Sequence, residues 1–141
     1  MTKRFLITVG LMGAVGVLLG SLGAHVLSGN IPQEDLDLFD VANEYLMFHA
    51  LALLGLAFMS RYVSRSYLNI IYYLFVIGVI LFSGTIFISS LKELTGFSLG
   101  GLSMLTPIGG ILLIAGWIAI ILSGINYKHK KRYHYENGLF S

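Results

Sequence analysis

Residues 66–91, SYLNIIYYLFVIGVILFSGTIFISSL, contain no Asp, Glu, Lys or Arg. Three further stretches also lack these four residue types, namely 5–33, 45–60 and 94–127. A helix needs roughly 20 mostly apolar residues to cross the hydrocarbon core of a membrane. Three of the four stretches exceed that length. The second falls short, but Arg61 directly after it can extend its guanidinium to the lipid headgroups and so lengthen the span.

These stretches predict four transmembrane helices near residues 5–27, 43–63, 68–91 and 107–126. Backbone groups in lipid must find hydrogen-bond partners within their own segment, so a helix is the expected form of runs this long. A membrane β-barrel would show alternating segments of roughly ten residues instead. The expected fold is an all-α, antiparallel four-helix membrane bundle that residues 1–141 form as a single domain.

The composition of the whole chain agrees with a membrane protein. Of its 141 residues, 56% are apolar and 11% are charged, and the mean hydropathy is +0.82. A soluble domain has about 25% charged residues, and disorder requires low hydrophobicity, so both classes are excluded. Because the chain has no cysteine, it has no disulfides, thiolate metal sites or cysteine nucleophiles. A net charge of +2 is too small to indicate a nucleic-acid partner.

The basic residues predict the orientation of the bundle. Eight of the nine fall on one predicted side, at the N-terminus, in the connection 61–65 and after residue 127, while Lys92 alone falls on the other. The positive-inside rule therefore predicts that both termini face the cytoplasm. Five of the seven acidic residues lie between positions 34 and 44, on the predicted outer side. The basic side chains expected to contact lipid headgroups are Arg61, Lys128, Lys130, Lys131 and Arg132.

The first span has a second interpretation, as a cleaved signal peptide. It combines a basic start with an apolar run and small residues at Ser21 and Gly23. Its apolar run of about 20 residues is longer than the 7–15 residues typical of a signal peptide, which favours a retained span. Cleavage would leave three helices and an N-terminus outside the membrane.

Two prolines indicate helix starts. Pro32 suits the first turn of an amphipathic extension of the second helix, on which Asp37, Asp40 and Glu44 share one face. Such an acidic stripe is typical of a solvated helix start, and the alternatives are a divalent-cation site or a partner-docking surface. A threonine directly before Pro107 predicts an N-cap followed by the first residue of the fourth span.

His25 and His49 are the candidate functional residues, because an ionisable side chain within a membrane indicates a functional site by default. Both are expected in the outer half of neighbouring antiparallel helices. Such a pair could ligate a haem iron or a metal, relay protons or contact a ligand, whereas neutral imidazoles that hydrogen-bond across helices need no ligand. The hypothesised ligand pocket comprises His25, Ser21, Tyr45, His49, Thr85 and Thr106.

Small residues form a stripe about 100° wide on the first predicted helix. They are Gly13, Gly16, Gly20, Gly23 and Ala24. Stripes of this kind let helix backbones approach closely in lipid. Packing within the bundle is the expected role, and a dimer interface is the alternative.

Four segments in order resemble a known family. GSLGAHVL at 20–27 resembles the end of its first helix, and NEYLMFHALALL at 43–54 resembles its aromatic-rich, histidine-containing second helix. LFSGT at 81–85 and LTPIGG at 105–110 resemble its third and fourth helices. The chain is thus similar to the domain of unknown function 423 family, small bacterial membrane proteins related to transmembrane protein 256 of animals. The resemblance implies a four-span protein of the bacterial inner (plasma) membrane with no established biochemical activity, and it places both histidines within family motifs.

No arrangement in the sequence combines a nucleophile, a base and oxyanion donors. The expected function is therefore non-enzymatic and without a cofactor: an accessory or binding module for a lipid or a partner membrane protein. One alternative is a small, dimeric transporter or proton-linked carrier, which would need a polar path through the inner half, where the spans offer only scattered Ser, Thr, Asn and Tyr. A haem- or quinone-binding protein is a further alternative.

Overall fold

A computed structural model describes residues 2–127, which form helices and turns without any strand. The long helices are α1 (Thr2–Leu22), α2 (Gln33–Met59), α3 (Arg65–Ser90) and α5 (Leu105–Ile125). The short elements are the π-helical turn η1 (Gly23–Leu27), which continues α1, then α4 (Lys92–Thr95) and the 3₁₀ turn η2 (Gly100–Met104), which leads into α5. Within the described residues, four helices are long and apolar enough to cross a membrane, which confirms the predicted all-α four-helix fold.

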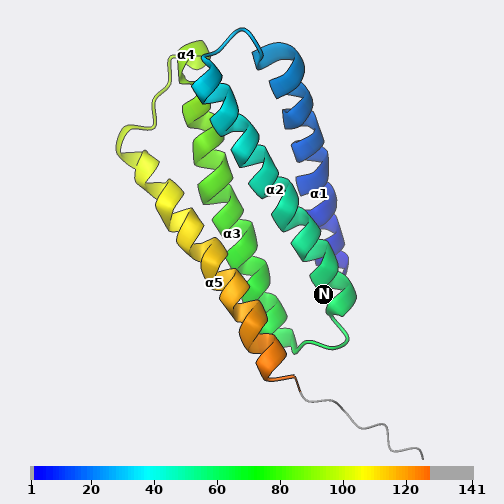
Figure 1. The fold of residues 1–141 in the computed structure, drawn as a ribbon. Coiled ribbons are helices and arrows are strands. Elements are labelled where there is room, and N and C mark those ends of the chain that lie inside the picture. Colours follow the sequence, from blue (N-terminus) through cyan, green and yellow to red (C-terminus); the bar gives the residue numbers. More distant parts are fainter. Residues whose placement is uncertain (1, 128–141) are drawn as a thin grey trace, which may run out of the picture.

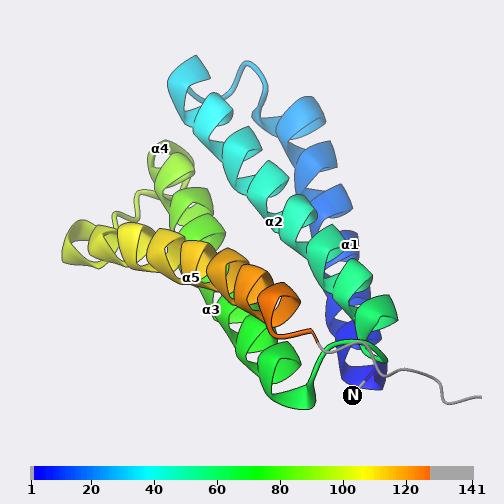
Figure 2. The ribbon, with the colours of Figure 1, turned by 60° about the horizontal axis from the view of Figure 1, so that its bottom comes forward.

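The four long helices run antiparallel in turn, so both described ends of the chain lie at the same end of the molecule (Figure 1). We call this end, with Lys3, Arg4, Arg61 and Arg65, the basic end, and the opposite end, with α4, the acidic end. Helix α1 packs on α2, α2 on α3, and α3 on α5. Figure 2 shows the consequence: α1 and α2 form one pair, and α3 and α5 form another that crosses it. Helices α2 and α5 therefore meet over only part of their length.

The α3–α5 contact depends on glycine. A Cβ added at Gly109 would lie 2.8 Å from the Gly78 carbonyl oxygen and 2.9 Å from the carbonyl carbon of Leu81, and would also meet the backbone nitrogen of Phe82. The obstacles are backbone atoms, which cannot move aside as a flexible side chain can. This close backbone approach is how small residues hold helices together in lipid, where the hydrophobic effect between helices is absent.

The small-residue stripe of α1 divides between two surroundings. A Cβ added at Gly16, Gly20 or Gly23 would come within 3.3 Å of a side chain on α2. These three glycines therefore lie in the α1–α2 contact, inside the bundle. Gly13 has no atom within 4 Å of such a Cβ, and Ala24 is exposed, so neither lies in that contact.

At the basic end, a cluster of polar and aromatic side chains ties α1 to α3. Arg4 donates a hydrogen bond of 2.7 Å to Asn69 Oδ1, and its guanidinium carbon lies 4.2 Å from the centre of the Tyr72 ring. Thr8 and Tyr72 share a hydrogen bond of 2.6 Å between their hydroxyl groups. The cation–π contact and the hydrogen bonds together provide partners for most of the polar side-chain atoms that α1 carries near the basic end.

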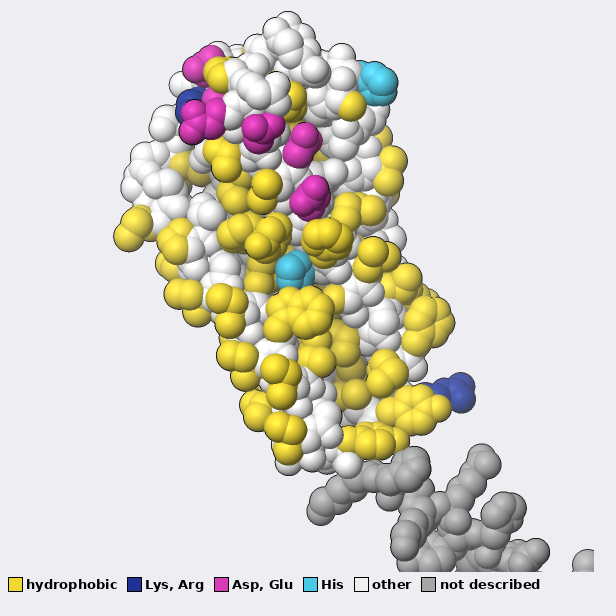
Figure 3. Space-filling model, in the orientation of Figure 1, with side chains coloured by type: hydrophobic (Ala, Val, Ile, Leu, Met, Phe, Trp, Pro, Cys, Tyr) yellow, Lys and Arg dark blue, Asp and Glu magenta, His cyan; other side chains and the backbone are white. Residues whose placement is uncertain are grey.

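At the acidic end, the buried Asp35 forms an ion pair of 3.3 Å with Lys92, the basic residue that the sequence placed alone on this side. Phe39 and Phe87 pack edge to face beneath this end, with ring centres 4.8 Å apart. Figure 3 shows acidic side chains gathered toward this end and apolar side chains over the face below. The predicted stripe is solvent-exposed at its three members, Asp37, Asp40 and Glu44.

Two helix starts differ from the expectation. Helix α2 begins at Gln33, so Pro32 occupies the N-cap position rather than the first turn. Helix α5 begins at Leu105, directly after the 3₁₀ turn, so the predicted N-cap Thr106 is already helical and Pro107 is the third helical residue. A proline is tolerated there because the N–H groups of the first turn have no partner within the helix. The Thr106 hydroxyl bonds to α3 instead of capping its own helix.

We expect Gly109→Ala to destabilise the protein by about 1–3 kcal/mol, because the added methyl group meets α3 backbone. Gly84→Ala on α3 is the matched control, since a Cβ there has no atom within 4 Å. Equilibrium unfolding in mixed detergent micelles would measure both variants. Equal stability of Gly109→Ala and the wild type would contradict the close approach of α3 and α5.

Candidate functional site

His49 lies in the centre of the molecule, on α2, and is only 4% exposed. Its Nδ1 is 2.7 Å from the Tyr45 carbonyl oxygen one turn earlier on the same helix. Its Nε2 is 3.2 Å from the indole Nε1 of Trp117 on α5. Among hydrogen bonds between described residues, this is the one that joins α2 to α5.

These two partners define the tautomer of His49. An indole N–H can only donate, so His49 Nε2 must be the acceptor and carries no proton. A carbonyl oxygen can only accept, so Nδ1 carries the proton and donates it to Tyr45. The ring is therefore the neutral imidazole, and both of its nitrogens are used within the protein. This leaves no nitrogen of His49 for a haem iron or another metal.

Aromatic rings surround the His49–Trp117 bond. The Phe75 ring of α3 is fully buried and lies 4.9 Å from the His49 ring and 5.3 Å from the Trp117 ring, measured between centres. Tyr45 lies beside His49 and packs on Phe82 of α3 at 4.6 Å. Three helices thus meet at this aromatic cluster, which lies between the acidic end and the basic end.

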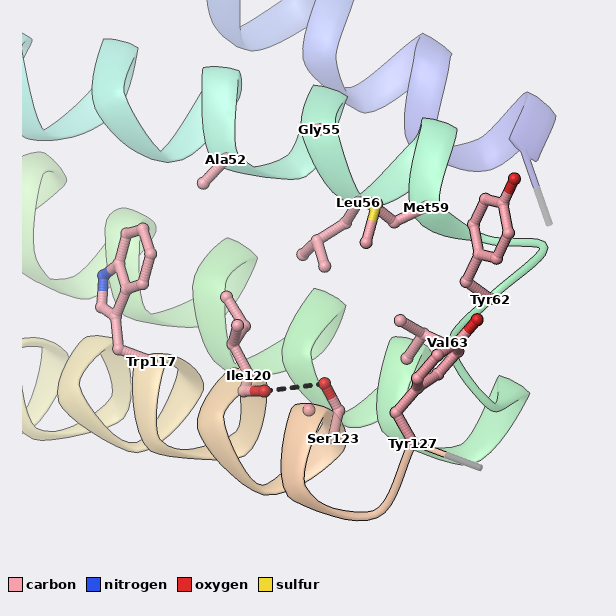
Figure 4. Close-up of a pocket in the computed structure, with 11 residues that line it drawn as sticks. Ala52, Gly55, Leu56, Met59, Tyr62, Val63, Trp117, Ile120, Ser123 and Tyr127 are labelled. Atoms are coloured by element: carbon pink, nitrogen blue, oxygen red, sulfur yellow. Dashed lines mark hydrogen bonds between the residues drawn. The ribbon is translucent and has the colours of Figure 1, made fainter. Parts of the chain in front are cut away.

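A groove of about 640 Å³ runs between α2 and α5 from the His49–Trp117 bond toward the basic end. Its α2 wall comprises Ala52, Gly55, Leu56 and Met59. Its α5 wall comprises Trp117, Ile120, Ser123 and Gly124. Figure 4 shows Trp117 at one end of the groove and Tyr62, Val63 and Tyr127 at the other. The volume is within the range of about 300–1,000 Å³ that small-molecule sites have.

Polar atoms are unevenly distributed along the groove. Ser123 within the wall donates its hydroxyl proton to the Ile120 carbonyl at 2.7 Å, and the Trp117 N–H is bonded to His49. The wall therefore offers its occupant mainly C–H surface. Tyrosine hydroxyl groups are found at the opposite end, which we call the mouth, formed by Tyr62, Val63 and Tyr127.

The structure brings the six residues of the hypothesised pocket together only in part. Tyr45 and His49 are neighbours, as described above. Thr85 and Thr106 share a hydrogen bond of 2.6 Å between α3 and α5. His25 and Ser21 are exposed near the acidic end, and no hydrogen bond, ion pair or ring contact of either side chain joins it to another residue in the range 2–127.

Neither Trp117 as a site residue nor the groove that it lines is predicted from the sequence. A single tryptophan within an otherwise aliphatic span was a signal, because a buried indole N–H requires an acceptor. His49 was the available acceptor, but nothing in the spacing of one helix indicates which residue of another lies opposite it.

Two other predictions concern the basic residues expected at the lipid headgroups and the acidic stripe of α2. Arg61 is exposed in the α2–α3 connection, while Lys128, Lys130, Lys131 and Arg132 lie outside the described residues. In the part of the chain that is described, no group of three or more His, Asp or Glu side chains could hold a metal ion. The acidic stripe of α2 thus has no partners there for a divalent cation.

We expect His49→Ala to lower the free energy of unfolding by about 2–4 kcal/mol, because it leaves a cavity and a Trp117 N–H without an acceptor. His25→Ala, at an exposed position, should change it by less than about 0.5 kcal/mol. Unfolding in mixed micelles measures both values. Emission from the one tryptophan of the chain reports separately whether the indole environment changes. Equal effects of the two substitutions would contradict the structural role of His49.

Comparison with known proteins identifies relatives along nearly the whole chain. The UPF0382 inner membrane protein YgdD of Escherichia coli strain K12 is 36% identical over 132 residues, which cover 92% of this chain and 96% of that protein. The UPF0382 membrane protein YwdK of Bacillus subtilis is 32% identical over 126 residues, covering 89% and 98% respectively. The UPF0382 membrane protein SAB0533 of Staphylococcus aureus is 35% identical over 125 residues, covering 89% and 98%.

No solved structure matches the chain. A family model described as "Protein of unknown function (DUF423)" matches residues 19–110, a segment that includes both histidines and the glycine contact of α3 with α5. The resemblance that the four sequence segments indicated is therefore confirmed. The chain belongs to the DUF423 family of membrane proteins, and the UPF0382 proteins above are its relatives.

Proposed function

We propose that this multi-pass membrane protein is a non-enzymatic binding module that holds one acyl chain of a phospholipid in the groove between α2 and α5. The observation that carries the proposal is the groove itself: about 640 Å³ of space, lined mainly by apolar side chains, between two membrane-spanning helices. Apolar clefts that contain few polar groups are the usual form of sites for apolar ligands.

The length of the groove suits one leaflet. Helix α5 rises about 12 Å from Trp117 to its end at Ile125, at 1.5 Å per residue, and Tyr127 extends the lining further. Half of a hydrocarbon core is about 15 Å thick. An acyl chain of one leaflet therefore matches the groove, whereas a helix from a second copy or a partner protein would have to cross both leaflets and is about 10–12 Å wide.

Charge at the mouth agrees with a phospholipid. Arg61 precedes Tyr62 and is exposed, and Arg65 is exposed at the start of α3. In the sequence, the basic run KHKKR directly follows Tyr127. Basic residues beside a membrane attract phosphate and anionic headgroups, by about 1 kcal/mol each. A lipid whose chain lies in the groove would have its phosphate near this basic end.

The proposed binding module has no catalytic activity. Both nitrogens of His49 are engaged within the protein, so this residue is not available as a general base. A transport function would need a polar path through the basic half of the bundle, where the core consists of side chains such as Leu53, Leu68 and Ile71. These observations favour a binding module over a carrier.

We place the basic end in the cytoplasm, following the positive-inside rule. The described residues of that end include Lys3, Arg4, Arg61 and Arg65, whereas Lys92 at the opposite end is paired with Asp35. Under this orientation the groove opens into the cytoplasmic leaflet of the bacterial inner membrane.

To test lipid binding, we suggest Gly124→Leu, which places a larger side chain in the groove wall at a position where an added Cβ has no atom within 4 Å. Native mass spectrometry after mild detergent extraction should show a retained phospholipid on the wild type and a loss of about tenfold or more on the variant, because the leucine side chain takes the place of several methylenes and removes their packing contacts. Gly10→Leu, also in open space but on α1, is the control and should retain the lipid. Wild-type protein that carries no lipid, or a partner protein in its place, would refute the proposal.

Orientation can be tested by single cysteines, because the chain has none of its own. Ser98→Cys near the acidic end and Ser66→Cys near the basic end are both at exposed positions. A membrane-impermeant maleimide applied from the periplasmic side should label Ser98→Cys, and should label Ser66→Cys only after the inner membrane is permeabilised. The reverse pattern would place the termini outside.

A further inference from the structure

We infer that Trp117, held in place by His49, closes the deep end of the groove and so determines the longest acyl chain that the groove accepts. This inference rests on the proposed lipid function. It assigns Trp117 as a specificity-determining residue for an acyl-chain ligand.

The lining of the groove ends where Trp117 reaches across to α2. On α2 the last lining residue toward the acidic end is Ala52, and His49 lies one turn beyond it. The hydrogen bond from Trp117 to His49 therefore spans the gap at the point where the groove stops. A chain that enters from the mouth meets the indole face at this point.

Two contacts hold the indole, and a close approach of the backbone beside it supports them. Its N–H is bonded to His49, and its ring lies 5.3 Å from the fully buried Phe75 ring. The residue before it is Gly116, where a Cβ would collide with the Phe75 ring, so α5 is held close against that ring. Trp117 is nonetheless 47% exposed, which leaves a face for contact with an occupant.

Displacing the indole would be costly in an apolar environment. If an over-long chain pushed Trp117 aside, the indole N–H and the unprotonated Nε2 of His49 would both lose their partner, and water is scarce at this depth. By contrast, the walls nearer the mouth include Gly55 and Gly124, which leave room for methylene groups. The groove is thus permissive along its length and restrictive at its deep end.

The inference predicts a sharp dependence on chain length. Purified protein would be exchanged into micelles that contain phosphatidylcholines of defined saturated chains, from dodecanoyl to arachidoyl, and retained lipid would be measured by native mass spectrometry. For the wild type, retention should rise with each added methylene while the chain still fits, because each methylene gains packing contacts with the groove wall. It should stop rising at the length that reaches Trp117.

Removal of the indole should move that limit. Trp117→Ala should continue to gain retention for chains beyond the wild-type limit, by the same increment per methylene that the wild type shows below its limit. Trp117→Phe retains a ring at the position and should keep a limit close to that of the wild type. His49→Asn, whose shorter side chain has no atom at the position of Nε2, should make the limit less sharp by loosening the indole. Ile118→Ala, exposed on α5 beside Trp117 but outside the groove lining, is the control and should match the wild type.

The outcomes separate this inference from the proposed function. Lipid retained by the wild type with the same limit in Trp117→Ala would overturn the role of Trp117 and leave lipid binding intact. No retained lipid in any protein would overturn both. Should Trp117→Ala fail to fold by circular dichroism, Trp117→Leu supplies the same test, because a leucine side chain is shorter than an indole and must also move the limit.

Discussion

The structure depends on one constraint: within a bilayer, each polar group needs a partner from the protein itself. Helices satisfy the backbone, and pairs across helices satisfy the side chains. Trp117 donates to His49, Thr85 bonds Thr106, and Arg4 bonds Asn69. Each pair joins two helices, so the requirement for a partner is also what sets how those helices are placed against each other. Among described residues, three buried side-chain atoms have no hydrogen-bond partner: Arg4 Nε, Asn43 Oδ1 and Ser83 Oγ.

Helix α3 is the element through which this arrangement creates a groove. It packs against α2 on one side and α5 on the other. The backbone contact at Gly109 draws α5 close to α3, so α5 follows α3 rather than α2. The hydrogen bond between the His49 and Trp117 side chains joins α2 to α5. Below that point the gap between them remains unfilled by protein, since glycine and alanine occupy part of both walls.

The sequence predicts the features that are determined within a single helix, such as the membrane spans. Uncharged stretches such as 66–91 gave the spans, because lipid excludes charge regardless of which helix lies nearby. Helix starts were less accurate: the Thr106–Pro107 pair has the composition of a cap, but the preceding 3₁₀ turn continues directly into α5. The pairing of His49 with Trp117 and the separation of His25 from both depend on helix rotation and crossing, which no pattern within a single span contains.

The hydrogen bond between His49 and Trp117 also changes how a histidine within the membrane is interpreted. An ionisable residue in a membrane suggests ligation or proton transfer, and that suggestion assumes a free ring nitrogen. Here one nitrogen is hydrogen-bonded to the backbone of its own helix and the other to the indole, so His49 holds Trp117 in place. An indole that has its N–H satisfied presents only its apolar face. By bonding the indole N–H, His49 therefore makes the deep end of the groove more apolar. Such an end suits the acyl chain that we propose as the occupant.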